Sequence, residues 1–338
     1  ARMVAALPES LHHTLDFENL AAKVALGRGD MTDALTHLQY WEQAIRRAPD
    51  TDTENKARLP ESLRLQATAL AALKREPEAL ALLNGILVQW PQDAAAWQMK
   101  AQYALKENRL DEALEYGQHL QELASGDAYG SYFCGVVLFR MGRMQEAYRC
   151  FDAAMHQNGR DAGCLLYQCR ILLTAGQWED AGKILKDLTA AGIEAPAMDY
   201  CLARMAAHEQ DAETAEKHYL ALLPACRDAN DAPDFAGEVF YRLVCLQYEK
   251  KEKAELLALA EEGLVHDSGS LSLMELRADL LREMDRIPEA ISAYEAILSQ
   301  SPRHPTASES LGRLYQFRVY DYAKAVQAYL RQIVVAGE

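Results

Sequence analysis

The clearest feature of this sequence is a pattern that recurs about every 34 residues, which only a repeat architecture accommodates. In each copy a turn leads to an acidic residue or two, then an Ala, and then an apolar residue three or four positions further on. The Ala falls at Ala34, Ala79, Ala113, Ala147, Ala181, Ala215, Ala290 and Ala325, and Leu256 replaces it in one copy. The successive spacings are 45, 34, 34, 34, 34, 41, 34 and 35 residues. A period of this length indicates supersecondary units that stack on one another.

Small residues within the copies predict two closely packed antiparallel helices in each. One offset of the first helix is small in most copies: Ala67, Ala101, Gly135, Cys169, Ala203, Ala278 and Gly312. We expect these residues to face the recurring Ala of the second helix, because helices approach closely only where side chains are small. Large residues one turn after the Ala should fill the space between repeats: Leu83, Phe151, Leu185, Tyr219 and Tyr294. Residue types that tolerate the left-handed backbone ending a helix precede the Ala by five positions: Asn108, Gly142, Gly176 and Asp285.

These positions resemble the tetratricopeptide repeat, a motif of 34 residues with Trp, Leu-Gly, Tyr, Ala, Phe, Ala and Pro at set offsets. Leu311, Gly312 and Tyr315 reproduce its Leu-Gly-x-x-Tyr segment, and Phe151 follows Ala147 at the family's distance. The resemblance covers nearly the whole chain. It implies an all-α fold, an α-α superhelix of about nine helix-turn-helix repeats.

We therefore predict a single solenoid over residues 1–338, with polar insertions near 47–58 and 225–236. The first helix is expected to be over-long, from Pro8 to about Leu26. The insertions are read as loop growth on the edge of the solenoid, which costs little free energy; hinges or partner-specific additions are the alternative. The repeats are predicted at approximately 14–47, 60–93, 94–127, 128–161, 162–195, 196–229, 237–270, 271–304 and 305–338.

The charge balance argues against nucleic acid and anionic membranes as ligands. The chain has 35 basic and 50 acidic residues, a formal net charge of −15, whereas both of these ligands are bound by basic surfaces. No apolar run approaches the roughly 18 residues of a membrane span. Seven cysteines without a Cys-x-x-Cys pair favour free thiols in a reducing compartment. We therefore expect a cytoplasmic protein with neither nucleic-acid nor membrane partners.

No motif for catalysis or cofactor binding is present. The sequence lacks a Gly-rich phosphate loop, a His-Glu-x-x-His segment and a Gly-x-Ser-x-Gly turn. Its histidines are scattered, and Cys169 occupies an offset where burial as a small apolar side chain explains it. We expect no enzyme activity, no cofactor and no metal site.

The resemblance also implies a binding groove, lined by the second, fifth, ninth and twelfth offsets of the first helices. In repeats four to seven these offsets are rich in Tyr and Arg, the residue types that dominate binding hot spots. Glu238 shares this lining. The alternative is that the tyrosines pack on neighbouring repeats and the arginines pair with nearby acids. The candidate peptide-binding residues are Tyr129, Tyr132, Val136, Phe139, Leu166, Arg170, Tyr200, Arg204 and Tyr241.

We therefore expect a protein–protein interaction scaffold or adaptor that binds a partner peptide or helix in this groove. Arg170 and Arg204 favour a partner with acidic groups or a free carboxylate. The clamp with which some relatives hold the C-terminal carboxylate of chaperones is not expected, since it requires Lys and Asn where repeat two has Arg64 and Thr68. The alternative is a substrate-recruiting or regulatory arm of a larger enzyme, co-chaperone or peptide sensor whose effector domain lies outside this segment.

Overall fold

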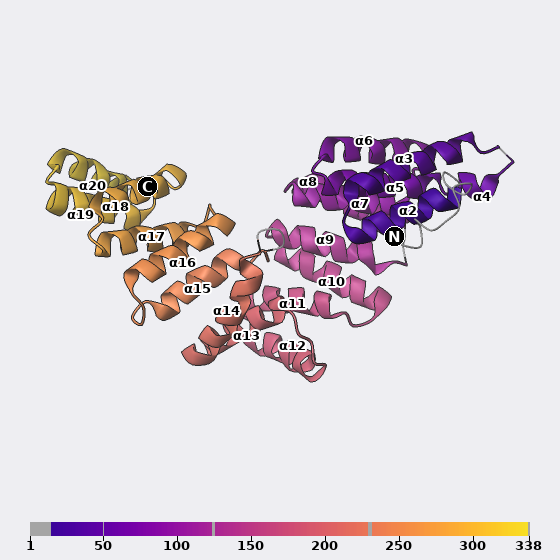
Figure 1. Cartoon of the computed structure of the whole chain (residues 1–338). Coiled ribbons are helices and arrows are strands. Elements are labelled where there is room, and N and C mark those ends of the chain that lie inside the picture. Colours follow the sequence, from indigo (N-terminus) through magenta and orange to yellow (C-terminus); the bar gives the residue numbers. More distant parts are fainter. Residues whose placement is uncertain (1–14, 50, 124–125, 229–231, 337–338) are drawn as a thin grey trace. The chain divides into compact units, whose positions relative to one another are not determined.

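The structure is a computed structural model that describes residues 15–49, 51–123, 126–228 and 232–336. All regular secondary structure in these ranges is helical, and the helices follow one another as antiparallel pairs joined by short turns (Figure 1). The predicted all-α repeat fold is confirmed. The expected start of the first helix at Pro8 lies outside the described residues.

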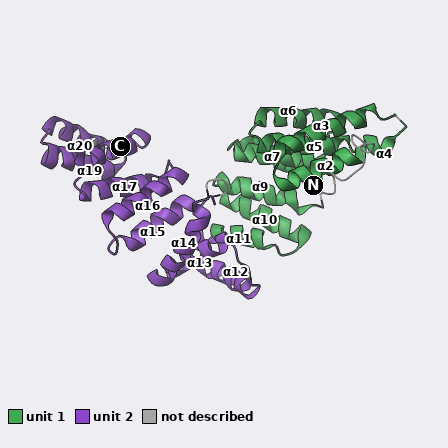
Figure 2. Ribbon diagram, viewed as in Figure 1, with its two compact units in different colours: residues 1–171 green, residues 172–338 purple. Residues whose placement is uncertain are grey.

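The chain divides into two compact units, residues 1–171 and 172–338 (Figure 2). A short helix, α4 (Thr53–Lys56), lies in the predicted insertion of unit 1. The first residues of α11 (Ala162–Thr174) also belong to unit 1. The other helices of unit 1 are α2 (Leu15–Arg28), α3 (Met31–Arg47), α5 (Leu59–Ala72), α6 (Glu76–Gln89), α7 (Ala94–Lys106), α8 (Leu110–Leu123), α9 (Ala128–Arg140) and α10 (Met144–Asn158).

Unit 2 contains the last residues of α11 and the helices that follow it. A π-helical turn, η2 (Tyr315–Val319), extends the first helix of its last pair. The helices are α12 (Trp178–Ala190), α13 (Pro196–His208), α14 (Ala212–Cys226), α15 (Ala236–Gln247), α16 (Lys253–His266), α17 (Leu271–Glu283), α18 (Ile287–Gln300), α19 (Pro305–Leu314) and α20 (Tyr322–Ala336).

The recurring Ala marks the same structural position throughout: it is the fourth residue of the second helix of each pair. Ala147 in α10 and Ala290 in α18 have no exposed surface, and Leu256, which replaces the Ala in α16, is only 1% exposed. A small side chain in the first turn lets the second helix approach its neighbours closely. The period seen in the sequence is therefore the period of helix packing.

The closest partners of the small residues in the first helix differ from our expectation. A methyl group on Gly135 would lie 2.7 Å from the ring of Phe151, and one on Gly312 would lie 2.5 Å from the ring of Tyr329. Both rings belong to residues one turn after the recurring Ala, not to the Ala itself. At these positions the missing side chain makes room for a large aromatic ring of the second helix.

The turn inside each pair has the predicted left-handed backbone. At the position five residues before the recurring Ala, φ is +56° at Asn108, +75° at Gly142, +73° at Gly176 and +62° at Asp285. Lys74, Gln210 and Tyr320 adopt the same conformation at the equivalent position, although their side chains disfavour it. The geometry of the repeat thus overrides residue preference at this turn.

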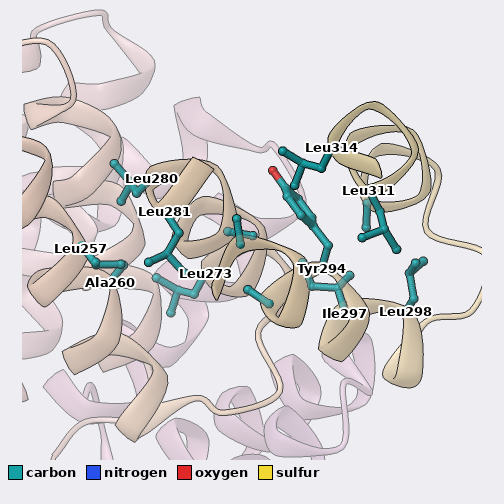
Figure 3. Packing of buried hydrophobic residues seen from close by; sticks show 14 of the residues in the cluster. Leu257, Ala260, Leu273, Leu280, Leu281, Tyr294, Ile297, Leu298, Leu311 and Leu314 are labelled. Atoms are coloured by element: carbon teal, nitrogen blue, oxygen red, sulfur yellow. The ribbon is translucent and has the colours of Figure 1, made fainter. Parts of the chain in front are cut away.

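Within unit 2, one buried apolar core joins the successive helix pairs from α15 to α20. In unit 2 a single apolar cluster passes from Leu257 on α16 through Leu281 on α17 and Tyr294 on α18 to Leu311 on α19 (Figure 3). The buried hydroxyl of Tyr294 donates a hydrogen bond of 2.6 Å to Oδ1 of Asp279. Because each helix pair completes the core of the next, a repeat is stable only next to its neighbours.

Candidate functional site

In unit 1, the candidate residues Tyr129 and Tyr132 line a cavity of about 460 Å³. Both come from α9, and the remaining walls come from the end of α10 and the start of α11. The Tyr129 hydroxyl accepts a hydrogen bond of 3.0 Å from Nε2 of Gln102 on α7, and its ring stacks on Phe133 with 6.0 Å between centroids. The lining residues are Asp127, Ala128, Tyr129, Tyr132, Ala154, Asn158, Asp161, Gly163 and Cys164.

Tyr132 also belongs to a cluster of aromatic rings that joins three helices of unit 1. Its ring meets the edges of Phe151 and Tyr167 at centroid distances of 5.9 and 6.2 Å. Tyr167 stacks on Phe151 at 4.9 Å and meets Phe139 at 5.4 Å. Burial raises the pKa of Tyr132 to about 12, so its hydroxyl stays protonated at neutral pH.

Arg170 lies against this aromatic cluster. Its guanidinium carbon is 4.6 Å from the ring centroid of Phe139 and 5.3 Å from that of Tyr167, distances typical of cation–π contacts. The side chain is mostly covered, at 8% exposure. Val136 and Leu166 are also buried, and Val136 is part of the apolar core. In unit 1, therefore, Tyr129, Tyr132 and Phe139 are the candidate residues that are only partly buried.

In unit 2, Tyr200 and Arg204 of α13 meet Glu238 of α15 in a hydrogen-bonded cluster. The Tyr200 hydroxyl donates to Oε2 of Glu238 at 2.5 Å, and Nη1 of Arg204 donates to the Tyr200 hydroxyl at 2.9 Å and to Oε1 of Glu238 at 3.1 Å. Arg242 donates to the same Oε1 at 3.3 Å. The Tyr200 ring stacks on Phe235 at 4.4 Å. One carboxylate thus faces two guanidinium groups, so the cluster carries a net positive charge.

The surroundings of Tyr200 and Arg204 favour the protonated forms of both side chains. Burial and the neighbouring carboxylate of Glu238 raise the pKa of Tyr200 well above its usual range. Burial opposes the charge on Arg204, but Tyr200 and Glu238 outweigh it and raise the pKa of Arg204. The remaining candidate, Tyr241, lies next to Arg242, whose guanidinium carbon is 5.9 Å from its ring centroid.

A family model described as tetratricopeptide repeat matches residues 64–128, 168–231 and 276–338. These matches cover more than half of the chain. The chain belongs to the tetratricopeptide repeat family. Together with the helix pairs, this membership gives it the architecture of a protein-interaction scaffold. Among curated protein sequences, none matches this one.

Solved structures of tetratricopeptide repeat type resemble the fold at low sequence identity. One chain of the APC/C hetero-tetramer Cut9–Hcn1 is 16% identical to this protein, with a TM-score of 0.62. The match covers 92% of the present chain and 58% of the Cut9–Hcn1 chain. The present chain therefore spans a little over half the length of that relative. Human IFIT1, solved as a dimer with m7Gppp-AAAA, is 13% identical with a TM-score of 0.58 over 95% of this chain and 77% of that one. PilF of Pseudomonas aeruginosa is 15% identical with a TM-score of 0.50, and the match covers 66% of this chain and 97% of PilF.

The structure distributes the candidate residues of this tetratricopeptide repeat protein between the two units. Tyr132 and Phe139 share one aromatic cluster in unit 1, and Tyr200 and Arg204 share one polar cluster in unit 2. Sequence reasoning placed Glu238 on the same lining but missed its role as the centre of the second cluster. It also missed Arg242, although residues four positions apart on a helix lie side by side, so the spacing from Glu238 indicated a contact.

Other chemistry is sparse in the part of the chain that the structure covers. There, no group of three or more His, Cys, Asp or Glu side chains is arranged to hold a metal ion. The cysteines are free thiols, and burial raises the pKa of Cys134 and of Cys164 to about 12, which disfavours the nucleophilic thiolate. None of the described helices combines the length and apolar character needed to cross a membrane.

Proposed function

We propose that this scaffold binds an extended or helical segment of a partner protein on the faces of its first helices, at α9 and α11 in unit 1 and at α13 and α15 in unit 2. The observation that carries the proposal is the clustering of tyrosines and arginines at these positions, where Arg170 and Tyr200 are buried and the others keep part of their surface accessible. Such side chains provide large contact areas with directional hydrogen bonds. The overall acidity of the chain makes the positive cluster around Glu238 a local exception that a partner can recognise.

The chemistry of the cluster in unit 2 indicates how an acidic group of the partner would bind. The Arg242 side chain is 42% exposed, whereas that of Arg204 is 15% exposed. A carboxylate arriving from solvent would therefore reach Arg242 first and share it with Glu238. Guanidinium groups bind carboxylates with two parallel hydrogen bonds, which fixes the orientation of the ligand.

A capture experiment tests this function. The chain is immobilised, and proteins from extracts of its source cells are quantified by mass spectrometry for the native sequence and for the double variant Arg204→Met and Arg242→Met. Methionine keeps much of the apolar stem and removes the charge. We expect specific partners to fall by about tenfold or more, as for loss of a binding hot spot.

The matched control is Arg286→Met, which removes an exposed arginine paired with Glu289 at the start of the second helix α18. It should leave capture unchanged. Equal capture by the double variant, with unchanged helical circular dichroism, would show that the first-helix face of unit 2 does not bind the partner.

We also propose a cytoplasmic location, because free and mostly buried thiols suit a reducing compartment.

A further inference from the structure

The cavity beside Tyr129 and Tyr132 has the opposite charge to the arginine cluster of unit 2. Its lining includes the carboxylates of Asp127 and Asp161 but no Lys or Arg. The Asp127 carboxylate accepts a hydrogen bond of 3.1 Å from the backbone N–H of Tyr129, and that of Asp161 accepts one of 3.0 Å from the N–H of Cys164. Neither carboxylate forms an ion pair with another residue in the described ranges. Two uncompensated negative charges therefore stand at one cavity.

The starts of α9 and α11 meet at this cavity, and helix starts by themselves favour anions. Here the two aspartates already satisfy that preference, because each caps its own helix. A further anion in the cavity would lie beside both carboxylates and be repelled. A neutral apolar group would remove water from the carboxylates without replacing its hydrogen bonds. Only a cation is attracted both by the two carboxylates and by the aromatic rings.

From this arrangement we infer that the cavity binds a cationic side chain, Lys or Arg, of the partner segment, a step that rests on the proposed function. The rings of Tyr129 and Tyr132 line the cavity, and aromatic rings attract cations through cation–π contacts. Asp127 and Asp161 offer carboxylate oxygens for charge-assisted hydrogen bonds, which are stronger than bonds between neutral groups. The volume of about 460 Å³ lies within the usual range of ligand pockets.

The Tyr132 hydroxyl adds a reason to favour a guanidinium. It stands near Gly163, where an added methyl group would be 3.8 Å from the hydroxyl oxygen. Among the described residues it has no hydrogen-bond partner. A tyrosine hydroxyl can accept an N–H, and a guanidinium has five of them in a fixed plane. An arginine side chain can therefore contact a ring, a carboxylate and this hydroxyl at once.

A direct binding measurement with small probes tests the inference without any partner. The full chain is prepared with 3-fluorotyrosine, and the fluorine signals of residues 129 and 132 are assigned from Tyr129→Phe and Tyr132→Phe. N-acetyl-arginine methylamide is then titrated against its neutral isostere, N-acetyl-citrulline methylamide. We expect saturable shifts of both signals by the arginine probe, with affinity on the order of millimolar, and binding about tenfold weaker for the citrulline probe.

The variant Asp127→Asn with Asp161→Asn removes both charges and keeps the helix caps, because asparagine caps a helix as well as aspartate does. It should weaken arginine binding about tenfold or more. Asp30→Asn is the control, since Asp30 also caps a helix of unit 1, by accepting from the N–H of Asp33, but does not line the cavity. This control should bind the arginine probe like the native chain.

Equal shifts by the two probes, or full arginine binding by the double asparagine variant, would overturn the inference. Because the probe experiment needs no partner protein, its failure leaves the capture result for Arg204 and Arg242 intact. Conversely, unchanged capture by the Arg204 and Arg242 double variant does not alter what the probes report about the cavity. The two claims can therefore fail separately.

Discussion

Backbone conformation at single residues fixes where each helix pair turns, and two glycines allow a direct comparison. Gly142 has a φ of +75°, whereas Gly85 lies inside α6. A methyl group added at either site meets no atom within 4 Å. Gly142→Ala should lower the free energy of unfolding by about 1 kcal/mol, because only glycine adopts this conformation without strain. Gly85→Ala should raise it by roughly 0.5–1 kcal/mol, because alanine favours a helix.

Unfolding in urea, monitored by circular dichroism, measures both changes in the free energy of unfolding. The same chemical substitution, made in open space, is thus expected to act in opposite directions at the two sites. Shifts of the unfolding midpoint in the same direction would contradict the role assigned to the turn.

The cysteines provide a second prediction about individual residues. Cys245 is exposed, whereas Cys134, Cys164, Cys169, Cys201 and Cys226 are buried. A thiol reagent should therefore modify Cys245 rapidly in the native protein and the buried thiols only slowly. After denaturation without reductant, all seven cysteines of the chain should react. Fewer than seven would mean that some are oxidised, against a reducing compartment.

The location of the candidate residues on first helices was predictable from the sequence, but the residues that they contact were only partly so. Tyr200 and Arg204 follow from the offsets of the repeat. Their contact with Glu238 depends on how α13 meets α15, and the longer spacing of 41 residues between the recurring positions Ala215 and Leu256 interrupts the period there. The cavity beside Tyr132 depends on the ends of three helices, which no single offset encodes.

At the scale of the helices, the packing of α9 against α10 gives a prediction about stability. Gly135→Ala on α9 would place a methyl group 2.7 Å from the ring of Phe151 on α10. We expect it to lower the free energy of unfolding by roughly 1–3 kcal/mol, the usual cost of overpacking a core. Adding Phe151→Leu should recover part of this loss, because leucine leaves room for the methyl group. A double-mutant cycle based on urea unfolding measures the coupling.

Strict additivity of the two changes would show that Gly135 does not make room for the ring. Gly27→Ala is a suitable control in α2, where an added methyl group has no neighbour within 4 Å. It should be neutral or slightly stabilising, as expected for a helical glycine.

The elements themselves were the most predictable part of the fold. The recurring Ala located the first turn of every second helix, and residues such as Gly142 and Asp285 located the turn before it. Local rules suffice here because each helix pair repeats the same steric problem. The closest partner of Gly135 was misjudged because the relative rotation of two helices decides which side chain faces a gap, and the period alone does not determine that rotation.

On the scale of the whole molecule, the central claim is that partners bind the faces of the first helices. A photo-crosslinking amino acid placed at Tyr129 or Tyr241, both partly exposed on first helices, should link the chain to a partner in cell extract. The same group placed at Val88 or Val265, which are 82% and 81% exposed on second helices, provides the matched comparison. We predict that one partner is linked through the first-helix sites, and that this crosslink is lost when Arg204 and Arg242 are replaced. Linkage of that partner through Val88 or Val265 alone would contradict it.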